Sequence, residues 1–594
     1  MRVLVLLLLG AWVPALATDV LTHHNNPART GAALDETQLS PETLKTQSFG
    51  RLFSLAVEGQ IYAQPLVVSA LDIPGKGLRN VVYIATMRNN VYAYDADDVK
   101  GTLLWNKSLG IPMSYDRIPK DAGALLGQYN IRPYIGITST PAIDRAKGLM
   151  YVVAKIAEPL CPGAEEATEA CPVVYRIHAL DIVTGGVVHQ ADIDIPMDPQ
   201  ESSVPARDVA RRHLQRPALL LANGRVYLAF GAHQDAPPFQ GWVMAFDADT
   251  LRRTDPVFCT TLHGQMGGIW QAGNGPAADK DGNLYVMTGN GSFNPAAKQF
   301  GSTLLKLSGD LTPTGWFAPA NVNDLNTLDV DLGSAGPMLL PDTDQILGGG
   351  KQGKLYVMSQ SNPGGPTPGG QQQHHWWHDG TNPPVQYFQA SRPWRTTWLS
   401  WIPFLFNVGY HHIHGSPVYW NGPKGPMIYV WPEQDNIKAY RYDSNRKKFN
   451  TRPIQGMMGN MGMPGGFLSI SANGAQDGIL WAAIPYRDDA WVEIVRGSMR
   501  AFRADTLDLL WSTDVNDPSD VFDFGKNVPP TVANGKVYLA TFSDRLNVYG
   551  LHAPQPAASA KPLPNVSKVS KNANHRGHVK GANGHTMHEM PPAK

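Results

Sequence analysis

Apolar and polar residues alternate in short runs along most of the chain, and turns rich in glycine, proline and asparagine separate the runs. A period of two is typical of β-strands, whereas few long stretches have the period of a helix. One unit recurs: a lead-in segment that often contains proline, an apolar strand, a Val-Tyr-type strand and a third strand that often ends near aspartate. The pattern predicts an all-β protein made of repeated small sheets.

Eight lead-in segments mark the repeats. They are residues 63–65, 139–141, 215–217, 274–276, 335–337, 415–417, 465–467 and 528–530, of which the seventh lacks proline at the aligned place. Four-stranded sheets around a common axis form a β-propeller, which leaves only short, protected edges. We therefore predict an eight-bladed β-propeller of four-stranded antiparallel blades over residues 50–550, with an insertion at 361–410.

The sequence also suggests how the ring closes. The last repeat ends near Tyr549 without a fourth strand, and a spare strand at residues 50–57 precedes the first repeat. We predict that this strand completes the eighth blade, so that the N- and C-terminal strands close the ring together. Seven blades are an alternative, because the repeat is irregular over residues 387–450.

Both ends of the chain differ from the repeats. Residues 1–17 are typical of a secretory signal peptide, because an apolar run precedes the small-x-small sequence at residues 15–17. We therefore expect a secreted or periplasmic protein, and no other segment is apolar enough to span a membrane. Residues 18–49 form an N-terminal segment, and residues 551–594 are predicted to be a disordered tail rich in His, Lys and Pro.

Charge and cysteine content narrow the function. The chain has 50 Lys and Arg residues and 50 Asp and Glu residues, so its formal net charge is zero. This balance argues against a nucleic-acid partner. Cys161 and Cys171 flank a small acidic loop and would pair in an oxidising compartment, whereas we expect Cys259 to be a buried, inert thiol.

Four residues stand at the starts or ends of successive predicted strands. They are Trp270, Asn290 within Thr-Gly-Asn-Gly-Ser, Asp331 and Lys351. In this order they resemble the site of the quinoprotein dehydrogenases, eight-bladed propellers that bind pyrroloquinoline quinone (PQQ) on their axis. The resemblance implies that Trp270 stacks on the quinone and that Lys351 hydrogen-bonds its carbonyls. It also implies that Asn290 and Asp331 bind calcium and that Asp331 is the catalytic base.

Other positions depart from the pattern of that family. The family's glutamate metal ligand is replaced by His233, with Asp235 as the nearest acid, and a second glutamate that holds the quinone is replaced by Tyr62. The cysteine pair over the quinone is absent, and no Cys-x-x-Cys-His attaches a haem. A histidine suits a hard cation less well than a carboxylate does. Each candidate also has a structural alternative, such as a turn at Asn290 or a core position for Trp270.

A second group of residues suggests copper. His411, His412 and His414 precede the sixth repeat, residues 457–463 include four methionines, and the tail adds further His and Met. Imidazole and thioether donors suit copper, although methionines also fill cores.

These observations leave three functions open. The one we favour is an exported PQQ-like propeller that acts as a binding or degenerate quinoprotein scaffold, with a small molecule or protein at its funnel rim. The alternatives are a PQQ-dependent alcohol or sugar dehydrogenase with calcium, and a periplasmic copper-binding protein.

Overall fold

The computed structural model describes residues 18–119, 130–158, 172–196, 204–235, 237–363, 384–394, 409–459 and 462–553. Outside these ranges lie the predicted signal peptide, the cysteine pair 161/171, most of the 361–410 insertion and nearly all of the tail.

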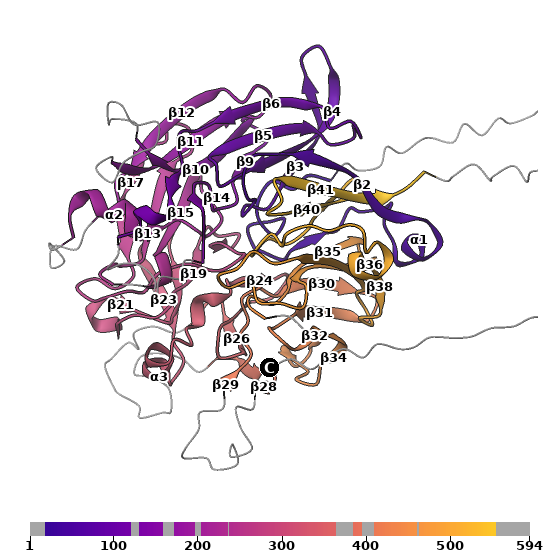
Figure 1. Cartoon of the computed structure of the whole chain (residues 1–594). Helices are drawn as coiled ribbons and strands as arrows, with labels where there is room; N and C mark the ends of the chain where they lie inside the picture. Colours follow the sequence, from indigo (N-terminus) through magenta and orange to yellow (C-terminus); the bar gives the residue numbers. More distant parts are fainter. Residues whose placement is uncertain are drawn as a thin grey trace, which may run out of the picture. The chain divides into compact units, whose positions relative to one another are not determined.

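Eight antiparallel sheets with four-stranded cores follow one another in a ring (Figure 1). Blades one to four consist of β3 (Leu66–Ile73), β4 (Gly77–Ala85), β5 (Asn90–Asp95) and β6 (Leu103–Ser108); β9 (Ala142–Asp144), β10 (Leu149–Ala157), β11 (Val173–Asp181) and β12 (Val187–Ile193); β14 (Leu220–Ala222), β15 (Arg225–Ala232), β16 (Trp242–Asp247) and β17 (Arg253–Cys259); and β18 (Ala277–Ala278), β19 (Leu284–Met287), β22 (Leu304–Leu307) and β23 (Pro313–Phe317).

Blades five to eight consist of β24 (Met338–Leu340), β25 (Gln345–Gly349), β26 (Lys354–Ser359) and β27 (Gln386–Gln389); β30 (Val418–Gly422), β31 (Gly425–Val430), β32 (Asn436–Asp443) and β34 (Ile454–Met458); β35 (Phe467–Asn473), β36 (Gln476–Pro485), β37 (Gly497–Arg503) and β38 (Leu509–Ser512); and β39 (Thr531–Ala533), β40 (Lys536–Ala540), β41 (Arg545–Leu551) and β2 (Phe49–Ala56). Short helices such as α1 (Pro41–Thr46), α2 (Ala206–Arg212), α3 (Val322–Thr327) and α4 (Thr513–Asn516) lie in the connections. The predicted fold class and the number of blades are confirmed.

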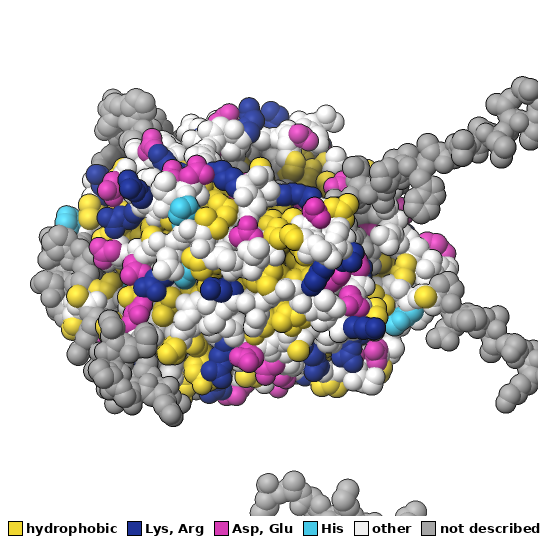
Figure 2. Space-filling view, turned by 90° about the horizontal axis from the view of Figure 1, so that it is seen from above, with side chains coloured by type: hydrophobic (Ala, Val, Ile, Leu, Met, Phe, Trp, Pro, Cys, Tyr) yellow, Lys and Arg dark blue, Asp and Glu magenta, His cyan; other side chains and the backbone are white. Residues whose placement is uncertain are grey.

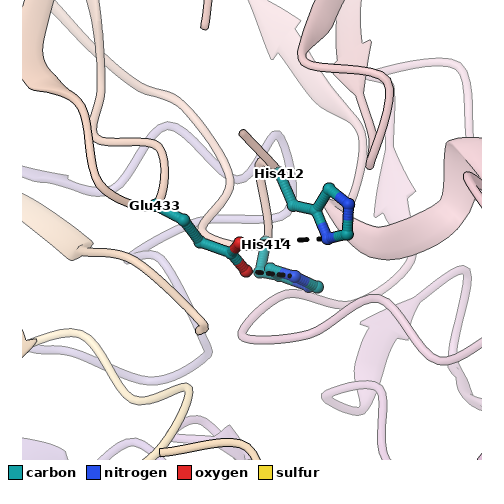
Figure 3. Close-up of side chains that lie close together, drawn as sticks. All are labelled: His412, His414 and Glu433. Atoms are coloured by element: carbon teal, nitrogen blue, oxygen red, sulfur yellow. Dashed lines mark ion pairs between the residues drawn. The ribbon is translucent and has the colours of Figure 1, made fainter. Parts of the chain in front are cut away.

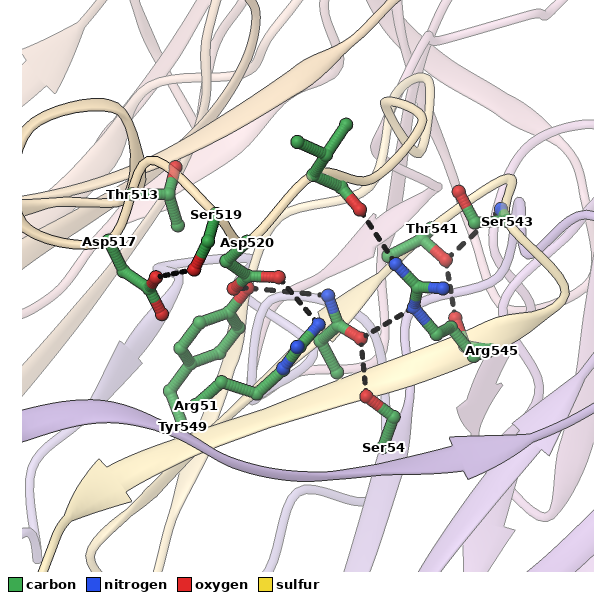
Figure 4. A network of polar contacts seen from close by, with 12 residues as sticks. Arg51, Ser54, Thr513, Asp517, Ser519, Asp520, Thr541, Ser543, Arg545 and Tyr549 are labelled. Atoms are coloured by element: carbon green, nitrogen blue, oxygen red, sulfur yellow. Dashed lines mark hydrogen bonds and ion pairs between the residues drawn. The ribbon is translucent and has the colours of Figure 1, made fainter.

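The ring closes as predicted. Strand β2 pairs antiparallel with β41, from Phe49 opposite Leu551 to Ala56 opposite Arg545. Polar side chains reinforce this joint (Figure 4): Arg51 on β2 forms an ion pair with Asp520 at 2.6 Å, and the Tyr549 hydroxyl on β41 donates to the same carboxylate at 2.6 Å. Backbone pairing and side-chain contacts therefore both hold the N-terminal strand β2 in the last blade.

The recurring tyrosine of the second strands links neighbouring blades. The hydroxyl of Tyr83 donates to the Ile182 carbonyl at 2.9 Å, and that of Tyr151 donates to the Ala248 carbonyl at 2.7 Å. Tyr227 and Tyr285 repeat the arrangement, with the carbonyls of Gly309 and Gln360 as acceptors. In these four blades the ring is buried and its hydroxyl reaches the next blade, so tyrosine adds a hydrogen bond there that phenylalanine would lack.

The N-terminal segment is part of the propeller, which the sequence did not predict. Backbone hydrogen bonds join residues 20–31 to the innermost strands or their ends: Val20 to Val67, Leu21 to Ile143, Pro27 to Ala278, Ala28 to Leu339, Thr30 to Tyr419 and Gly31 to Ile470. Strand β1 (Ala32–Ala33) then pairs with β35, and the Glu36 carboxylate accepts from the Gly535 amide. We call residues 18–36 the N-terminal plug, because this stretch crosses the inner strands of the ring.

Arg29 anchors the N-terminal plug. Its side chain is fully buried and donates to the backbone carbonyls of Pro276, His23 and Leu219 and to the Thr22 hydroxyl, at 2.8 to 3.1 Å. Beside it, the rings of His23 and His24 stack with centroids 4.4 Å apart. The N-terminal plug therefore brings a buried cation and two buried imidazoles into the ring.

The surface carries mixed charge. In Figure 2 basic and acidic side chains are interspersed over the face that is seen from above.

Cys259 is buried, as predicted. No helix in the described part of the chain is long and apolar enough to cross a bilayer.

Candidate functional site

The topology brings the candidate residues to one end of the ring. Trp270 and Asp331 precede the innermost strands β18 and β24, whereas Asn290 and Lys351 follow the second strands β19 and β25. In an antiparallel meander the start of the first strand and the end of the second strand lie at the same edge. The repeated blade therefore gathers residues that are far apart in sequence around the axis.

Asp331 is the centre of this group. Its side chain is fully buried, its Oδ2 accepts from the Trp270 indole N–H at 2.7 Å, and its Oδ1 lies 2.8 Å from the Lys351 ammonium. The same ammonium lies 5.4 Å from the centre of the Trp270 ring. A Cβ at Gly289 would lie 3.0 Å from both Asp331 Oδ2 and Trp270 Nε1, so the glycine of the Thr-Gly-Asn-Gly-Ser motif leaves room for this pair.

Asp329 connects Asn290 to the group. Its Oδ1 lies 2.8 Å from the Lys351 ammonium and accepts from Asn290 Nδ2 at 2.7 Å. Although burial lowers the pKa of Lys351, the carboxylates of Asp331 and Asp329 raise it above its ordinary value. The amide oxygen of Asn290 is buried and has no hydrogen-bond donor among the described residues. Trp270, Asn290, Asp329, Asp331 and Lys351 thus form one connected cluster, which we call the axial cluster.

Asp235 lies near enough to the axial cluster to interact electrostatically with Asp331 and Lys351. Burial and the neighbouring carboxylate of Asp331 raise the pKa of Asp235 to about 7. His233 instead lies with its Nε2 3.1 Å from the amine of Lys155, which also donates to the backbone carbonyls of Arg211 and His213. This contact occupies one of the two imidazole nitrogens, and metal binding by His233 stays a prediction.

A second cluster lies beside Trp270. His412 and His414 precede β30, and Glu433 follows β31, so all three come from the same end of blade six. Figure 3 shows the Glu433 carboxylate pointing toward both imidazoles, with Oε1 2.9 Å from His414 Nε2 and Oε2 3.9 Å from His412 Nδ1. The ring of His414 lies 5.7 Å from that of Trp270. We call these three residues the His-Glu cluster.

The protonation of the His-Glu cluster follows from its burial. Burial lowers the pKa of His414 to about 3 and that of His412 to about 4, so both imidazoles are neutral at physiological pH. Burial also raises the pKa of Glu433 to about 7. Each neutral imidazole carries a lone pair on one of its two nitrogens.

Two of the methionines of the copper hypothesis lie on an outer strand of blade six. Met457 and Met458 belong to β34, an outer strand of blade six, where Met457 Sδ lies 3.1 Å from an Arg500 nitrogen and Met458 is 43% exposed. Met461 and the tail lie outside the described residues. Copper binding stays a prediction.

Tyr62 is the residue that the resemblance to the quinoprotein dehydrogenases sets against a glutamate of that family. Its ring packs against Phe542 with centroids 4.6 Å apart, and the guanidinium of Arg216 lies 5.6 Å from its centre. An aromatic ring and a cation therefore lie where the resemblance predicts an acidic residue.

Comparison with solved structures defines the class of fold. A quinohemoprotein alcohol dehydrogenase from Pseudomonas putida superposes with a TM-score of 0.53 at 15% identity, covering 91% of this chain and 82% of that one. A europium-containing methanol dehydrogenase superposes with a TM-score of 0.53 at 13% identity, covering 90% of this chain and 98% of that one. No protein-family profile and no curated protein sequence matches the chain. The fold is that of the quinoprotein dehydrogenase-like eight-bladed propellers.

Sequence reasoning missed three acidic residues in or beside the two clusters as site residues. Asp329 contacts both Lys351 and Asn290, Asp235 lies near Asp331, and Glu433 faces the histidine pair. Asp235 and Glu433 both follow second strands, β15 and β31, as Asn290 follows β19. An acidic residue shortly after the second strand of a blade was therefore the sequence signal that could have identified Asp235 and Glu433 as site residues.

Proposed function

We propose that the protein is an exported propeller of the quinoprotein type whose axial cluster binds a small molecule together with a cation of the calcium class. The observation that carries this proposal is the axial cluster itself, in which Asp329 and Asp331 share the ammonium of Lys351 and a third carboxyl group, Asp235, lies nearby.

The donor atoms fit a hard cation. The buried amide oxygen of Asn290 has no hydrogen-bond donor in the described part of the chain, while the amide nitrogen of the same side chain donates to the Asp329 carboxylate. Burial, and after it repulsion by the Asp331 carboxylate, raises the pKa of Asp235, and a dication would relieve that repulsion. Calcium prefers oxygen donors of this kind. Asn290, Asp331 and Asp235 would hold the ion. Asp235 would then be the metal ligand that the resemblance placed at His233.

The surroundings also suit a planar, anionic ligand such as PQQ. Trp270 offers an aromatic ring beside the ammonium of Lys351, and Arg216 over Tyr62 adds positive charge where a glutamate was expected. A site with these groups favours a flat molecule that carries carbonyl or carboxylate oxygens. This makes ligand binding the function that the geometry supports best.

Oxidation of an alcohol or sugar is the second candidate. The fully buried Asp331 carboxylate is positioned by Trp270 and Lys351 and is suited to accept a hydroxyl proton. Lys351 would stabilise negative charge that develops on a neighbouring carbonyl oxygen. When bound, PQQ would supply the two-electron acceptor that this reaction needs.

The test is a titration of the purified full-length protein with PQQ in the presence and absence of Ca²⁺, followed by quenching of Trp fluorescence. We expect saturable, calcium-dependent binding that is lost in Trp270→Phe and Lys351→Met and weakened in Asn290→Ala. Lys306→Met is the matched control, because Lys306 lies on β22 and donates to the Gln360 carbonyl. Absence of binding in the wild-type protein would remove the proposal.

The same preparation separates binding from catalysis. Alcohol-dependent reduction of a dye by the loaded protein, lost in Asp331→Asn while PQQ still binds, would establish the dehydrogenase. Binding without dye reduction across alcohols and sugars would leave a binding protein.

A further inference from the structure

We propose that the His-Glu cluster is a binding site for one divalent transition-metal ion, separate from the oxygen-rich axial cluster. Its ligands are His412, His414 and Glu433, whose candidate donor atoms all lie within 4.8 Å of one another.

Local chain geometry holds these donors together. His412 and His414 are two residues apart in a non-helical segment, a spacing that places both side chains on one side of an extended chain. The backbone amide of Glu433 donates to the His412 carbonyl at 3.1 Å, which fastens the second segment to the first. Donor atoms around one such ion lie about 3–4 Å apart, since each bond measures about 2.0–2.2 Å. Small side-chain rotations would complete this arrangement.

The hydrogen-bonding of the cluster is incomplete without an ion. His412 Nδ1, His414 Nε2 and Glu433 Oε1 are all buried atoms, and none forms a well-aligned hydrogen bond among the described residues, since the 2.9 Å contact between His414 Nε2 and Glu433 Oε1 lacks hydrogen-bond geometry. His414 itself is only 3% exposed. Leaving buried polar atoms unsatisfied is costly, and a chain that forms only an internal Glu-His pair would align that pair for a hydrogen bond. One metal ion would satisfy all three atoms at once.

The donor set selects the class of ion. Two imidazole nitrogens and one carboxylate oxygen suit borderline ions such as Zn²⁺, Co²⁺ or Fe²⁺, whereas Ca²⁺ and Mg²⁺ prefer oxygen alone. Three protein ligands leave at least one coordination position open. The side chain of His412 is 29% exposed, which gives an ion a route to the site. Because the His414 ring lies 5.7 Å from Trp270, the ion would be a neighbour of the axial cluster without sharing its ligands.

The experiment is a Co²⁺ titration of the metal-stripped, full-length protein in the presence of excess Ca²⁺, read by visible ligand-field absorption and by the number of ions bound. Calcium would saturate oxygen-donor sites, and Co²⁺ bound by tail histidines is common to every variant. We expect His412→Ala, His414→Ala and Glu433→Gln each to bind one Co²⁺ fewer than the wild type.

His411→Ala is the matched control, because His411 adjoins the cluster and is not one of its three ligands. We expect this variant, and Asn290→Ala at the axial cluster, to retain the Co²⁺ signal whether or not PQQ binds there. His412→Ala keeps the test valid if the more buried His414 variant fails to fold. Equal Co²⁺ binding by wild type and His412→Ala would overturn the proposal, as would displacement of the ion by Ca²⁺.

Discussion

The indole N–H of Trp270 donates to the buried carboxylate of Asp331 at 2.7 Å, between residues that are 61 positions apart in sequence. Asp331 is fully buried, so this bond and the Lys351 ion pair stabilise a charge that water does not reach. We predict that Trp270→Phe lowers the free energy of unfolding by about 1–3 kcal/mol, because it leaves a buried charged acceptor short of one donor. Chemical denaturation of the ligand-free protein would measure this loss.

A second tryptophan separates loss of the bond from loss of ring volume. The Nε1 of Trp316 on β23 is buried and has no acceptor in the described ranges. Trp316→Phe therefore removes ring volume without breaking a hydrogen bond. Equal destabilisation by the two variants would show that the bond to Asp331 contributes nothing.

The fold was largely predictable because each blade repeats the same local signals. Proline in the lead-in and tyrosine in the second strand recur, and the spare strand before the first repeat had to pair with the unfinished last blade. The site was only partly predictable. Asn290 and Asp331 stand in a recognisable motif, whereas the bond from Asn290 to Asp329 depends on how neighbouring blades pack. Arg29 also escaped prediction, because its acceptors are mostly backbone carbonyls, which have no sequence signature.

The inter-blade tyrosines give a second prediction. Tyr151→Phe removes the hydroxyl that donates to the Ala248 carbonyl, and we expect it to cost about 1 kcal/mol of unfolding free energy. The hydroxyl of Tyr429 is buried in blade six without a partner among the described residues, so Tyr429→Phe should be neutral or stabilising. Thermal unfolding of the pair would check this, and similar losses in both would contradict it.

Arg29 gives a third prediction, about the N-terminal plug. Arg29→Met keeps the length of the side chain but removes every donor to Pro276, His23 and Leu219. We expect a loss of at least about 2 kcal/mol, since several buried carbonyls become unsatisfied. Arg79→Met is the control, because the Arg79 side chain is 41% exposed and its ion pair should contribute little. Limited proteolysis would then show earlier cleavage within residues 18–36 in the Arg29 variant alone.

The proposed export gives a fourth prediction, which concerns Thr18. Thr18 is 4% exposed, and its backbone nitrogen donates to Asn534 Oδ1 at 2.9 Å. If the signal peptide is removed after residue 17, this nitrogen becomes the amino terminus of the mature protein and keeps its acceptor. Intact-mass measurement of protein from the secreted or periplasmic fraction should show a chain that begins at Thr18. A chain that retains residues 1–17 would contradict both cleavage and export.

The buried histidines of the N-terminal plug predict how stability depends on pH. Burial, with the nearby charge of Arg29, lowers the pKa of His24 from its ordinary 6.5 to about 3. Above pH 6.5 the imidazole is neutral in the folded and unfolded chains alike, so its titration does not change the free energy of unfolding there. As the pH falls from 6.5 toward 3, His24 becomes protonated in the unfolded chain but stays neutral in the folded chain. The free energy of unfolding therefore falls by at most about 1.4 kcal/mol per pH unit.

We therefore expect His24→Gln to flatten the acid limb of the stability curve between pH 6.5 and 3. The hydrogen bond from the residue 24 backbone amide to Gln64 survives the change, because it does not involve the side chain. His189→Gln on β12 is the control, since that histidine is exposed and its replacement should leave the slope unchanged. Denaturant midpoints measured at several pH values would provide the slopes. Identical slopes in the wild type and His24→Gln would contradict the prediction, because they would mean that the folded protein accepts the His24 proton at no cost in stability. The stacked ring of His23 and the charge of Arg29 beside His24 are the reasons to expect a cost.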